Sequence, residues 1–264
     1  MTTNRPVHVD VSELTQRFVS RQGEIVALEG VTFSLSAGEF VCLLGPSGCG
    51  KTSLLRILAG LQDPTQGSVR IEHPRHEGVT DFAMVLQEHG LFPWMSLARN
   101  ISFPLQSGGG LAKDKAIAIA MEHLARVGLE SFADHYPHQV SGGMKQRVSV
   151  ARSFAMQPAL LLMDEPFVFL DYQTRLSLHS LLLDLWHERQ TTVFFVTHDI
   201  EEAVALADRV LVMSKRPGTL KADMKIDLPR PRAIFELRGD ARFGHYVSQL
   251  TQMIREEMAD VTSQ

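Results

Sequence analysis

A glycine-rich stretch beginning at residue 45 carries the residue types that bind phosphate. Gly45, Gly50, Lys51 and Thr52 fit the spacing G-x-x-x-x-G-K-[ST]. Glycines let the backbone curl around an anion, and the N-terminus of a following helix adds partial positive charge. We expect Lys51 to reach the β- and γ-phosphates of a nucleoside triphosphate and the Thr52 hydroxyl to ligate Mg²⁺. The expected contacts with ATP are Gly45, Pro46, Ser47, Gly48, Cys49, Gly50, Lys51, Thr52 and Ser53.

Four polar residues follow apolar runs elsewhere in the chain: Gln87, Asp164, Glu165 and His198. Phosphoryl transfer needs the γ-phosphate and Mg²⁺ held, and an attacking water oriented. We expect Asp164 to hold Mg²⁺, Glu165 to orient or deprotonate the water, and Gln87 to contact Mg²⁺ or that water. His198 would hydrogen-bond the γ-phosphate. Each residue alone reads equally well as an ordinary polar strand end, but together with the phosphate loop they predict ATP hydrolysis.

The elements that must position these residues can be read from the apolar pattern. A short apolar run at 40–44 predicts a buried strand before the glycine loop, and 53–59 has helical spacing after it. Further strands are predicted at 7–14, 31–35, 68–71, 82–86, 159–163, 191–196, 210–214 and 220–227. Helices are predicted at 111–129, 144–156 and, as an amphipathic tail, 243–258, and a polar turn at 73–80. The pattern indicates an α/β protein: an N-terminal antiparallel sheet, a parallel nucleotide-binding core and an inserted helical region.

Composition narrows the class of protein. The 264 residues include 26 Lys and Arg against 30 Asp and Glu, and a net charge of −4 argues against a dedicated nucleic-acid binder. Cys42 lies in a predicted strand and Cys49 in the loop, so neither suggests a disulfide framework or a zinc site. The N-terminus lacks the apolar core of a signal peptide, and no apolar run approaches the roughly 20 residues that span a bilayer. A reducing, cytoplasmic setting fits, and any membrane role would need a partner.

Residues 140–147, Val-Ser-Gly-Gly-Met-Lys-Gln-Arg, resemble the signature motif of the ATP-binding cassette (ABC) family. The resemblance extends over nearly the whole chain. It implies a P-loop NTPase (RecA-like) mixed sheet core, with ATP and Mg²⁺ as cofactors. It also implies a homodimer in which the signature of one chain faces the ATP of the other. The residues implied to face the partner's ATP are Ser141, Gly142, Gly143 and Gln146.

The resemblance also assigns Phe18 and Asp171. From spacing alone Phe18 reads as a core aromatic, whereas the resemblance aligns it with the adenine-stacking aromatic of the family. Asp171 matches the D-loop aspartate. Relatives usually carry two small residues before the Leu-Asp of that loop, and this chain has Val168 and Phe169. Two milder departures are Val140 in place of Leu and Lys145 in place of Arg.

The resemblance implies one nucleotide-binding domain over 1–264. Residues 1–89 and 157–230 would form the ATP-binding core with its β-subdomain, 90–156 the helical signature subdomain, and 231–264 a C-terminal helical tail. Within the helical part, Leu91, Phe92 and Trp94 follow Gln87 closely. We expect them either to form a groove for a helix of a membrane subunit or to pack in the core of the subdomain.

Short peptides at 87–94, 213–218 and 227–232 resemble importer ATPases of the nitrate, sulfonate and taurine group, with pyrimidine-precursor importers still open. The resemblance implies two transmembrane subunits, an extracytoplasmic binding protein, no nucleic acid, and a place at the cytoplasmic face of the cell membrane. One alternative is a non-transport cassette, which the short interval between loop and signature disfavours. The other is a scaffold cassette that binds ATP and hydrolyses it weakly, which the pair Val168 and Phe169 keeps open.

Overall fold

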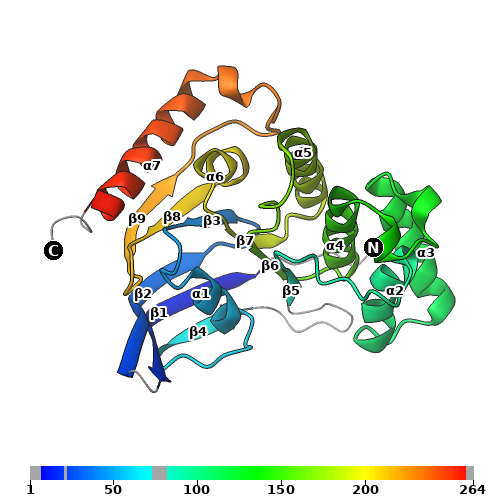
Figure 1. The fold of residues 1–264 in the computed structure, drawn as a ribbon, viewed down its shortest axis with the longest axis horizontal. Helices are drawn as coiled ribbons and strands as arrows, with labels where there is room; N and C mark the ends of the chain where they lie inside the picture. The colour runs from blue at the N-terminus through cyan, green and yellow to red at the C-terminus, as the bar shows by residue number, and fades with distance from the viewer. Residues whose placement is uncertain (1–6, 21–22, 73–81, 260–264) are drawn as a thin grey trace. The chain divides into compact units, whose positions relative to one another are not determined.

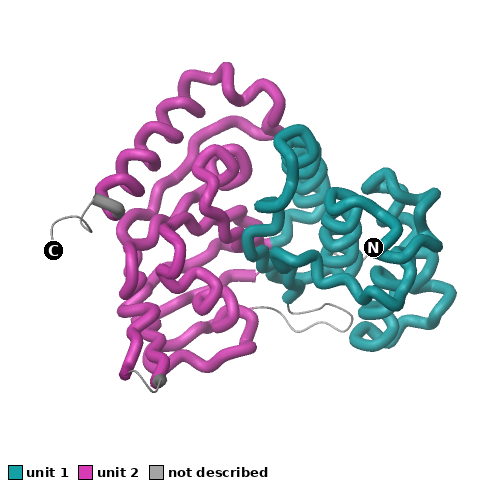
Figure 2. Tube along the Cα trace, in the orientation of Figure 1, with its two compact units in different colours: residues 1–5, 74–191 teal, residues 6–73, 192–264 magenta. Residues whose placement is uncertain are grey.

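The computed structural model describes residues 7–20, 23–72 and 82–259. The polar turn predicted at 73–80 lies outside the described residues. The chain divides into two compact units (Figure 2). Of the described residues, the first unit contains 82–191 and the second contains 7–72 and 192–259. The subdomains predicted from the sequence have their boundaries elsewhere, at 89/90, 156/157 and 230/231. That division stays a prediction.

The second unit contains an antiparallel sheet of β1 (His8–Ser20), β2 (Gly23–Leu35) and β4 (Gln66–Glu72), in the order β2-β1-β4 (Figure 1). The predicted N-terminal antiparallel sheet is therefore confirmed, but β1 and β2 are much longer than the predicted strands. The pairing of β1 with β2 shifts register near Leu14 and again near Gln16, and Glu13 has a φ of 47°. These irregularities interrupt the alternation of apolar and polar residues that marks a strand in the sequence.

The same unit contains a group of strands in the order β7-β3-β8-β9. The strands β7 (Thr192–Val196), β3 (Phe40–Leu44) and β8 (Arg209–Met213) run parallel, and β9 (Leu220–Lys225) pairs antiparallel with β8. Every residue of β3 and β7 is buried, as expected for strands covered on both faces. These strands were predicted within two residues at each end.

The described residues of the second unit also form the helices α1 (Lys51–Leu58), α6 (Ile200–Leu206) and α7 (Ala241–Ala259), besides a short 3₁₀ turn, η3 (Leu237–Gly239). The helix after the glycine loop and the amphipathic tail helix were both predicted. The tail buries Phe243 and Leu250, two of the residues that marked its apolar face. The seven-residue α6 was not predicted, since it is too short for helical periodicity to stand out.

The first unit pairs β5 (Phe82–Val85) with β6 (Leu160–Asp164) in parallel and contains α2 (Leu97–Ser107), α3 (Lys113–Arg126), α4 (Gly142–Ala155) and α5 (Tyr172–Arg189). Two 3₁₀ turns, η1 (Glu130–Phe132) and η2 (Pro137–Gln139), connect α3 to α4. A buried core joins α2, α3 and α4 through residues such as Ile101, Leu124 and Val148. This core confirms that the region after residue 90 is helical.

Two helices of the first unit were not predicted individually. In α2, Pro104 lies inside the helix and disguises it in the sequence. In α5, leucines surround the helix rather than marking one stripe, so its 18 residues show no clear helical period. Along the part of the chain that the structure describes, no helix is both long and apolar enough to cross a membrane.

Candidate functional site

The glycine loop lies between β3 and α1 in the second unit, and its glycines are required by space. A Cβ atom on Gly45 would lie 2.9 Å from the Cys49 Sγ and 3.0 Å from the Met213 Cβ. Gly50 has a φ of 101°, and a Cβ there would lie 2.6 Å from the Leu28 side chain. Larger residues at these two positions would push the loop out of shape, so the loop has the tightly curled backbone that the prediction of a phosphate site requires.

Lys51 is held inside the loop. Its side chain is 6% exposed, and its Nζ donates hydrogen bonds to the carbonyl oxygens of Gly45 (2.8 Å) and Pro46 (3.0 Å). The positive charge therefore already lies within the loop, where a phosphate would gain it as a partner. Thr52, the next residue of α1, is exposed, and Ser53 is half-buried. The start of α1 thus exposes the Thr52 hydroxyl next to the buried Lys51 ammonium group.

A turn between β8 and β9 packs against the backbone of the glycine loop. The Gly218 N–H donates to the Ala27 carbonyl at 2.9 Å, and the Glu29 N–H donates to the Gly218 carbonyl at 3.0 Å. A Cβ on Gly218 would lie 2.0 Å from the Cys49 carbonyl oxygen. The sequence predicts a turn at 216–218 between two strands, but it does not predict that this turn packs against the glycine loop. Its signal was a glycine after proline between two apolar runs.

His198 lies at the same edge of the sheet as the glycine loop. The strand β7 ends at Val196, which pairs with Leu43 of β3, directly before the loop. Two residues beyond the strand, His198 has an exposed side chain. Asp199 caps α6, because its Oδ1 accepts from the Glu202 N–H at 3.1 Å. The predicted position of His198 at a strand end is confirmed, and its role toward phosphate stays a prediction.

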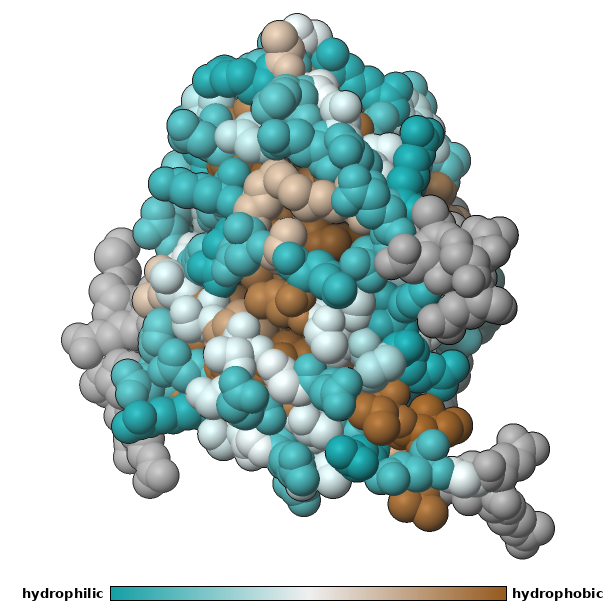
Figure 3. Space-filling model, turned by 90° about the vertical axis from the view of Figure 1, so that its left-hand side faces the viewer, coloured by the Kyte–Doolittle hydropathy of each residue, from teal (hydrophilic) through white to brown (hydrophobic). Residues whose placement is uncertain are grey.

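Phe18 lies in β1 near the end of the β1–β2 hairpin, where its side chain is 40% exposed. It faces Ile25 across the pair, and Val19 beside it is 87% exposed. Figure 3 shows hydrophobic side chains gathered at this end of the hairpin. Leu28, which touches Gly50, pairs with Gln16, two residues before Phe18. The reading of Phe18 as a core aromatic is therefore wrong, and its predicted stacking on adenine stays open.

In the first unit, β5 and β6 bring Gln87, Asp164 and Glu165 to one edge. The two strands run parallel with Val85 opposite Met163. Gln87, two residues after β5, and Asp164, the last residue of β6, therefore lie at the same edge of the sheet. All three side chains are half-buried. Glu165 has a φ of 44°, a left-handed conformation that costs a non-glycine residue about 1–3 kcal/mol. Strained backbone of this kind clusters at functional sites, which supports a chemical role for this edge.

The loop after Gln87 is tied to the signature helix α4. The ring of His89 hydrogen-bonds the side-chain oxygen of Gln146. The carbonyl of His89 accepts from the Ser149 hydroxyl at 2.8 Å, and the carbonyl of Gly90 accepts from Arg152 at 2.8 Å. Burial lowers the pKa of Arg152. The loop beside Gln87 and the helix α4 are thus joined by three side chains.

Gln146 itself is fully buried and bonds His89 in this structure. Sequence reasoning missed this local contact, since nothing in the spacing pairs residue 89 with residue 146. Its predicted contact with the ATP of a partner chain stays a prediction.

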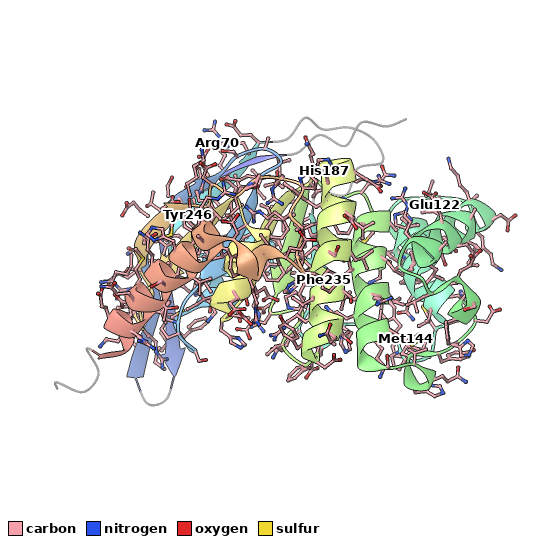
Figure 4. All side chains as sticks on the ribbon, turned by 90° about the horizontal axis from the view of Figure 1, so that it is seen from above. Arg70, Glu122, Met144, His187, Phe235 and Tyr246 are labelled. Atoms are coloured by element: carbon pink, nitrogen blue, oxygen red, sulfur yellow. The ribbon has the colours of Figure 1, made fainter. Side chains whose placement is uncertain are left out.

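The signature residues lie at the N-terminus of α4, whose first turn carries Met144, labelled in Figure 4. The Ser141 hydroxyl caps the helix by accepting from the Met144 N–H at 3.3 Å. Gly142 is exposed, and a Cβ there would meet nothing within 4 Å. A helix N-terminus with an exposed glycine is an anion-binding arrangement, as the predicted contact with ATP requires.

The N-termini of α4 and α5 are in contact. A Cβ on Gly143 would lie 2.7 Å from Thr174 Cγ2 in the first turn of α5. The Thr174 N–H donates to the Asp171 Oδ1 at 3.0 Å, so Asp171 caps α5. Hydrogen bonds from Thr174 lower the pKa of Asp171. The predicted D-loop residue and the predicted signature residues are therefore brought together in the first unit.

The D-loop stretch before Asp171 presents Phe169 to solvent. Phe169 is 71% exposed, whereas Phe167 is 1% exposed and its ring centroid lies 5.3 Å from that of His179. The core residue of this stretch is thus Phe167. Phe169 does not pack in the core of its own chain, so the departure from the family pattern lies on the surface.

The large apolar residues after Gln87 also differ from one another in exposure. Leu91 packs against the core of α2, α3 and α4. The ring of Phe92 lies 5.6 Å from that of Trp94 and 5.5 Å from that of Phe103. Trp94 is 69% exposed. Core packing therefore accounts for Leu91, while Trp94 belongs to the surface.

The residues predicted to ligate Mg²⁺ are Thr52, Gln87 and Asp164, and all three offer oxygen atoms, the ligands that Mg²⁺ prefers. Among the described residues no group of three or more His, Cys, Asp and Glu could hold a metal ion by itself. That donor set fits Mg²⁺, which usually keeps several waters and takes its other ligands from substrate phosphates.

Comparison with known proteins gives one consistent family. The profile described as ABC transporter matches residues 28–168. The nitrate import ATP-binding protein NrtD of Synechocystis sp. is 40% identical over 262 residues, 97% of this chain and 98% of that protein. The aliphatic sulfonates import ATP-binding protein SsuB of Bacillus cereus is 40% identical over 226 residues, 85% of this chain and 88% of that protein.

A solved structure agrees with the sequence matches. The dimeric structure of the ATP-binding cassette MJ0796 in a post-hydrolysis state, bound to ADP and Pi, superposes with a TM-score of 0.73 at 31% identity. The match covers 84% of this chain and 100% of that one. The α/β fold with a mixed sheet and a separate antiparallel sheet is thereby confirmed.

Proposed function

This chain belongs to the ABC transporter family and is one of its ATPases, and from that premise we propose that it energises the import of a small solute through partner membrane subunits. The observation that carries the proposal is 40% identity with a nitrate import ATP-binding protein along 97% of the chain. The second relative takes its name from aliphatic sulfonates. A small anion of the nitrate or sulfonate kind is accordingly the proposed class of solute.

In the proposed ATPase cycle, each predicted site residue has a separate role. Lys51 neutralises the β- and γ-phosphates once it leaves the loop carbonyls that hold it. Glu165 orients and deprotonates the attacking water, and His198 donates to the γ-phosphate. Thr52, Gln87 and Asp164 hold Mg²⁺, which supplies charge neutralisation on the phosphate oxygens when bound. Phe18 offers its exposed ring to adenine.

A second copy of the chain completes the reaction site in this proposal. Related cassettes form dimers. Ser141 and Gly142 lie exposed at the N-terminus of a 14-residue helix, where they bind the γ-phosphate of ATP held by the other copy. Asp171, capping the neighbouring helix, lies beside them through the contact of Gly143 with Thr174.

The remaining partners follow from the importer role. Two transmembrane subunits would carry the solute, an extracytoplasmic binding protein would deliver it, and this chain would work at the cytoplasmic face of the cell membrane. The exposed Trp94 and the rings of Phe92 and Phe103 offer an aromatic contact for a helix of the membrane subunit. They stand close in sequence to Gln87, through which nucleotide state would be transmitted.

The experiment that tests the proposal is affinity purification of the chain from its native membranes in detergent, followed by identification of the membrane subunits and reconstitution in vesicles. We expect two copies of the chain with two permease subunits, and ATP-dependent uptake of nitrate or a sulfonate. An ATPase that purifies without any integral membrane protein, and whose turnover responds to nucleic acid instead, would contradict the importer role.

A further inference from the structure

Arg232 lies in the basic proline segment after β9 and is buried, with 7% of its surface exposed. Its Nη1 donates to the carbonyl oxygens of Val204 at 3.1 Å and Ala205 at 3.0 Å, both in the last turn of α6. Its Nε and Nη2 are also buried and have no hydrogen-bond partner among the described residues. Burial, with the nearby charge of Arg230, lowers the pKa of Arg232 to about 10. A guanidinium is costly to place in this way, so its position calls for an explanation.

The helix that Arg232 holds begins at Ile200, and only its cap residue Asp199 separates it from His198. Both ends of α6 are fixed. At its start, the Thr197 hydroxyl donates to Glu202, and Asp199 caps the first turn. At its end, Arg230 donates to the Leu206 carbonyl at 2.7 Å and is paired with Asp208. Since α6 has only seven residues, a displacement at its end is carried to its start, where His198 is attached.

The C-terminal tail is built onto the same helix. The tail helix α7 packs against α6, and the two lie side by side in Figure 1. Arg238 pairs with Glu201 in the first turn of α6 at 2.6 Å. The Tyr246 hydroxyl, labelled on α7 in Figure 4, accepts from the Asp227 N–H at 3.1 Å. The segment from β9 to α7 therefore contacts α6 at both its first turn and its last turn.

Packing alone does not require an arginine here. Buried Phe243 and Leu250 already dock the tail, and an apolar side chain of similar volume at residue 232 would bury without an unmet charge. What arginine adds is directional hydrogen bonding to two carbonyls at the negative end of a helix. Such bonds fix the position of α6 along its axis, which apolar contacts do not.

We propose that Arg232 is a positioning residue for His198: it holds α6, and with it the histidine, in register with the γ-phosphate. The proposal rests on the proposed role of His198 and extends it to the C-terminal tail. Displacing a reacting group by about 1 Å can cost about a hundredfold in rate. Loss of Arg232 should therefore lower kcat and leave ATP binding by the glycine loop intact, because the hydrogen bonds of Arg232 go to α6.

The test compares kcat, KM and ATP affinity in Arg232→Met, His198→Ala and the double variant. We expect Arg232→Met to lower kcat about tenfold or more with ATP affinity unchanged, and to have no further effect once His198 is Ala. Arg242→Met is the matched control, because Arg242 pairs only with Asp240 of its own segment among the contacts described. Arg232→Lys, which keeps a donor, serves if the Met variant does not fold.

The outcomes separate this proposal from the one it rests on. If His198→Ala leaves kcat unchanged, the role of His198 fails and the positioning role fails with it. If His198→Ala lowers kcat while Arg232→Met and Arg232→Lys do not, only the positioning role is overturned. A double variant whose loss in kcat is the product of the two single losses would also overturn it, since Arg232 would then act independently of His198.

Discussion

The glycine loop and the signature region both bind phosphate in the proposed function, yet the first is tightly packed and the second is exposed. In the loop, Gly45 and Gly50 have no room for a side chain, and Lys51 is 6% exposed. In the signature region, Ser141 and Gly142 are exposed and Phe169 is 71% exposed. The glycine loop is preformed within one chain. The signature region presents groups that nothing in the same described chain covers.

The difference has a physical reading. A site that binds ligand alone gains from being preformed, because the cost of ordering the loop is met during folding. A site that acts only on a second chain has to stay exposed until that chain arrives. Substitutions in the glycine loop should therefore change ATP affinity or stability, and substitutions in the signature region should change association of the two chains.

Lys51→Ala should lower ATP affinity by about a hundredfold or more, because a charge-assisted hydrogen bond to phosphate is worth up to about 3 kcal/mol. Equilibrium titration with ATP measures the loss. Lys215→Ala, which removes an exposed lysine, is the control and should bind ATP normally. Unchanged affinity in Lys51→Ala would remove the glycine loop from the ATP site.

Gly50→Ala and Gly142→Ala form a matched pair. At Gly50 the new Cβ would meet the Ala27 carbonyl at 2.8 Å with a φ of 101°, so we expect a loss of roughly 1–3 kcal/mol in the free energy of unfolding. At Gly142 the Cβ meets nothing within 4 Å, so the same change should leave thermal stability intact and weaken only ATP-driven association. Equal melting temperatures for the two variants would show that the glycine loop is no more tightly packed than the start of α4.

The double variant Val168→Gly with Phe169→Ala should associate more tightly in ATP and turn over faster without membrane subunits. An exposed Phe at a close contact between two chains overpacks it, at a cost of about 1–3 kcal/mol, which the smaller residues relieve. Since Phe169 is exposed, thermal stability should not fall. A drop in stability with unchanged turnover would refute this account of the D-loop.

Trp94→Ala should have the smallest effect on the isolated chain. Trp94 is 69% exposed, so ATP affinity and basal turnover should match those of the parent protein. Assembly with the membrane subunits, and their stimulation of turnover, should be reduced. Transport and assembly at parental levels would exclude Trp94 from the coupling contact.

Local chemistry made much of this molecule predictable from sequence. The glycine loop, the buried strands and the start of α4 were predicted from residue spacing, and the structure has them within about two residues. Three helices were not predicted: α2, α5 and α6, which has only seven residues. The helix α5 carries leucines on all sides, and α2 contains Pro104, so neither shows a helical stripe.

Contacts between distant residues were not predictable. The bond between His89 and Gln146 joins residues 57 apart, and Arg232 meets carbonyls 27 and 28 residues away. Neither pairing has a repeating pattern in the sequence. Side-chain direction was equally hidden: Phe167 and Phe169 are two residues apart in one loop, yet one is buried and the other is exposed.

The most direct test of the central claim, that the signature of one chain completes the ATP site of another, uses Glu165→Gln. The amide keeps the shape of the carboxylate and loses the base, so ATP should bind and remain unhydrolysed. Light scattering during size exclusion should then show the mass rising with ATP from the 29.4 kDa of one chain to twice that value. Adding Ser141→Arg should abolish the rise without affecting ATP binding. A variant that binds ATP yet stays at 29.4 kDa would contradict the claim.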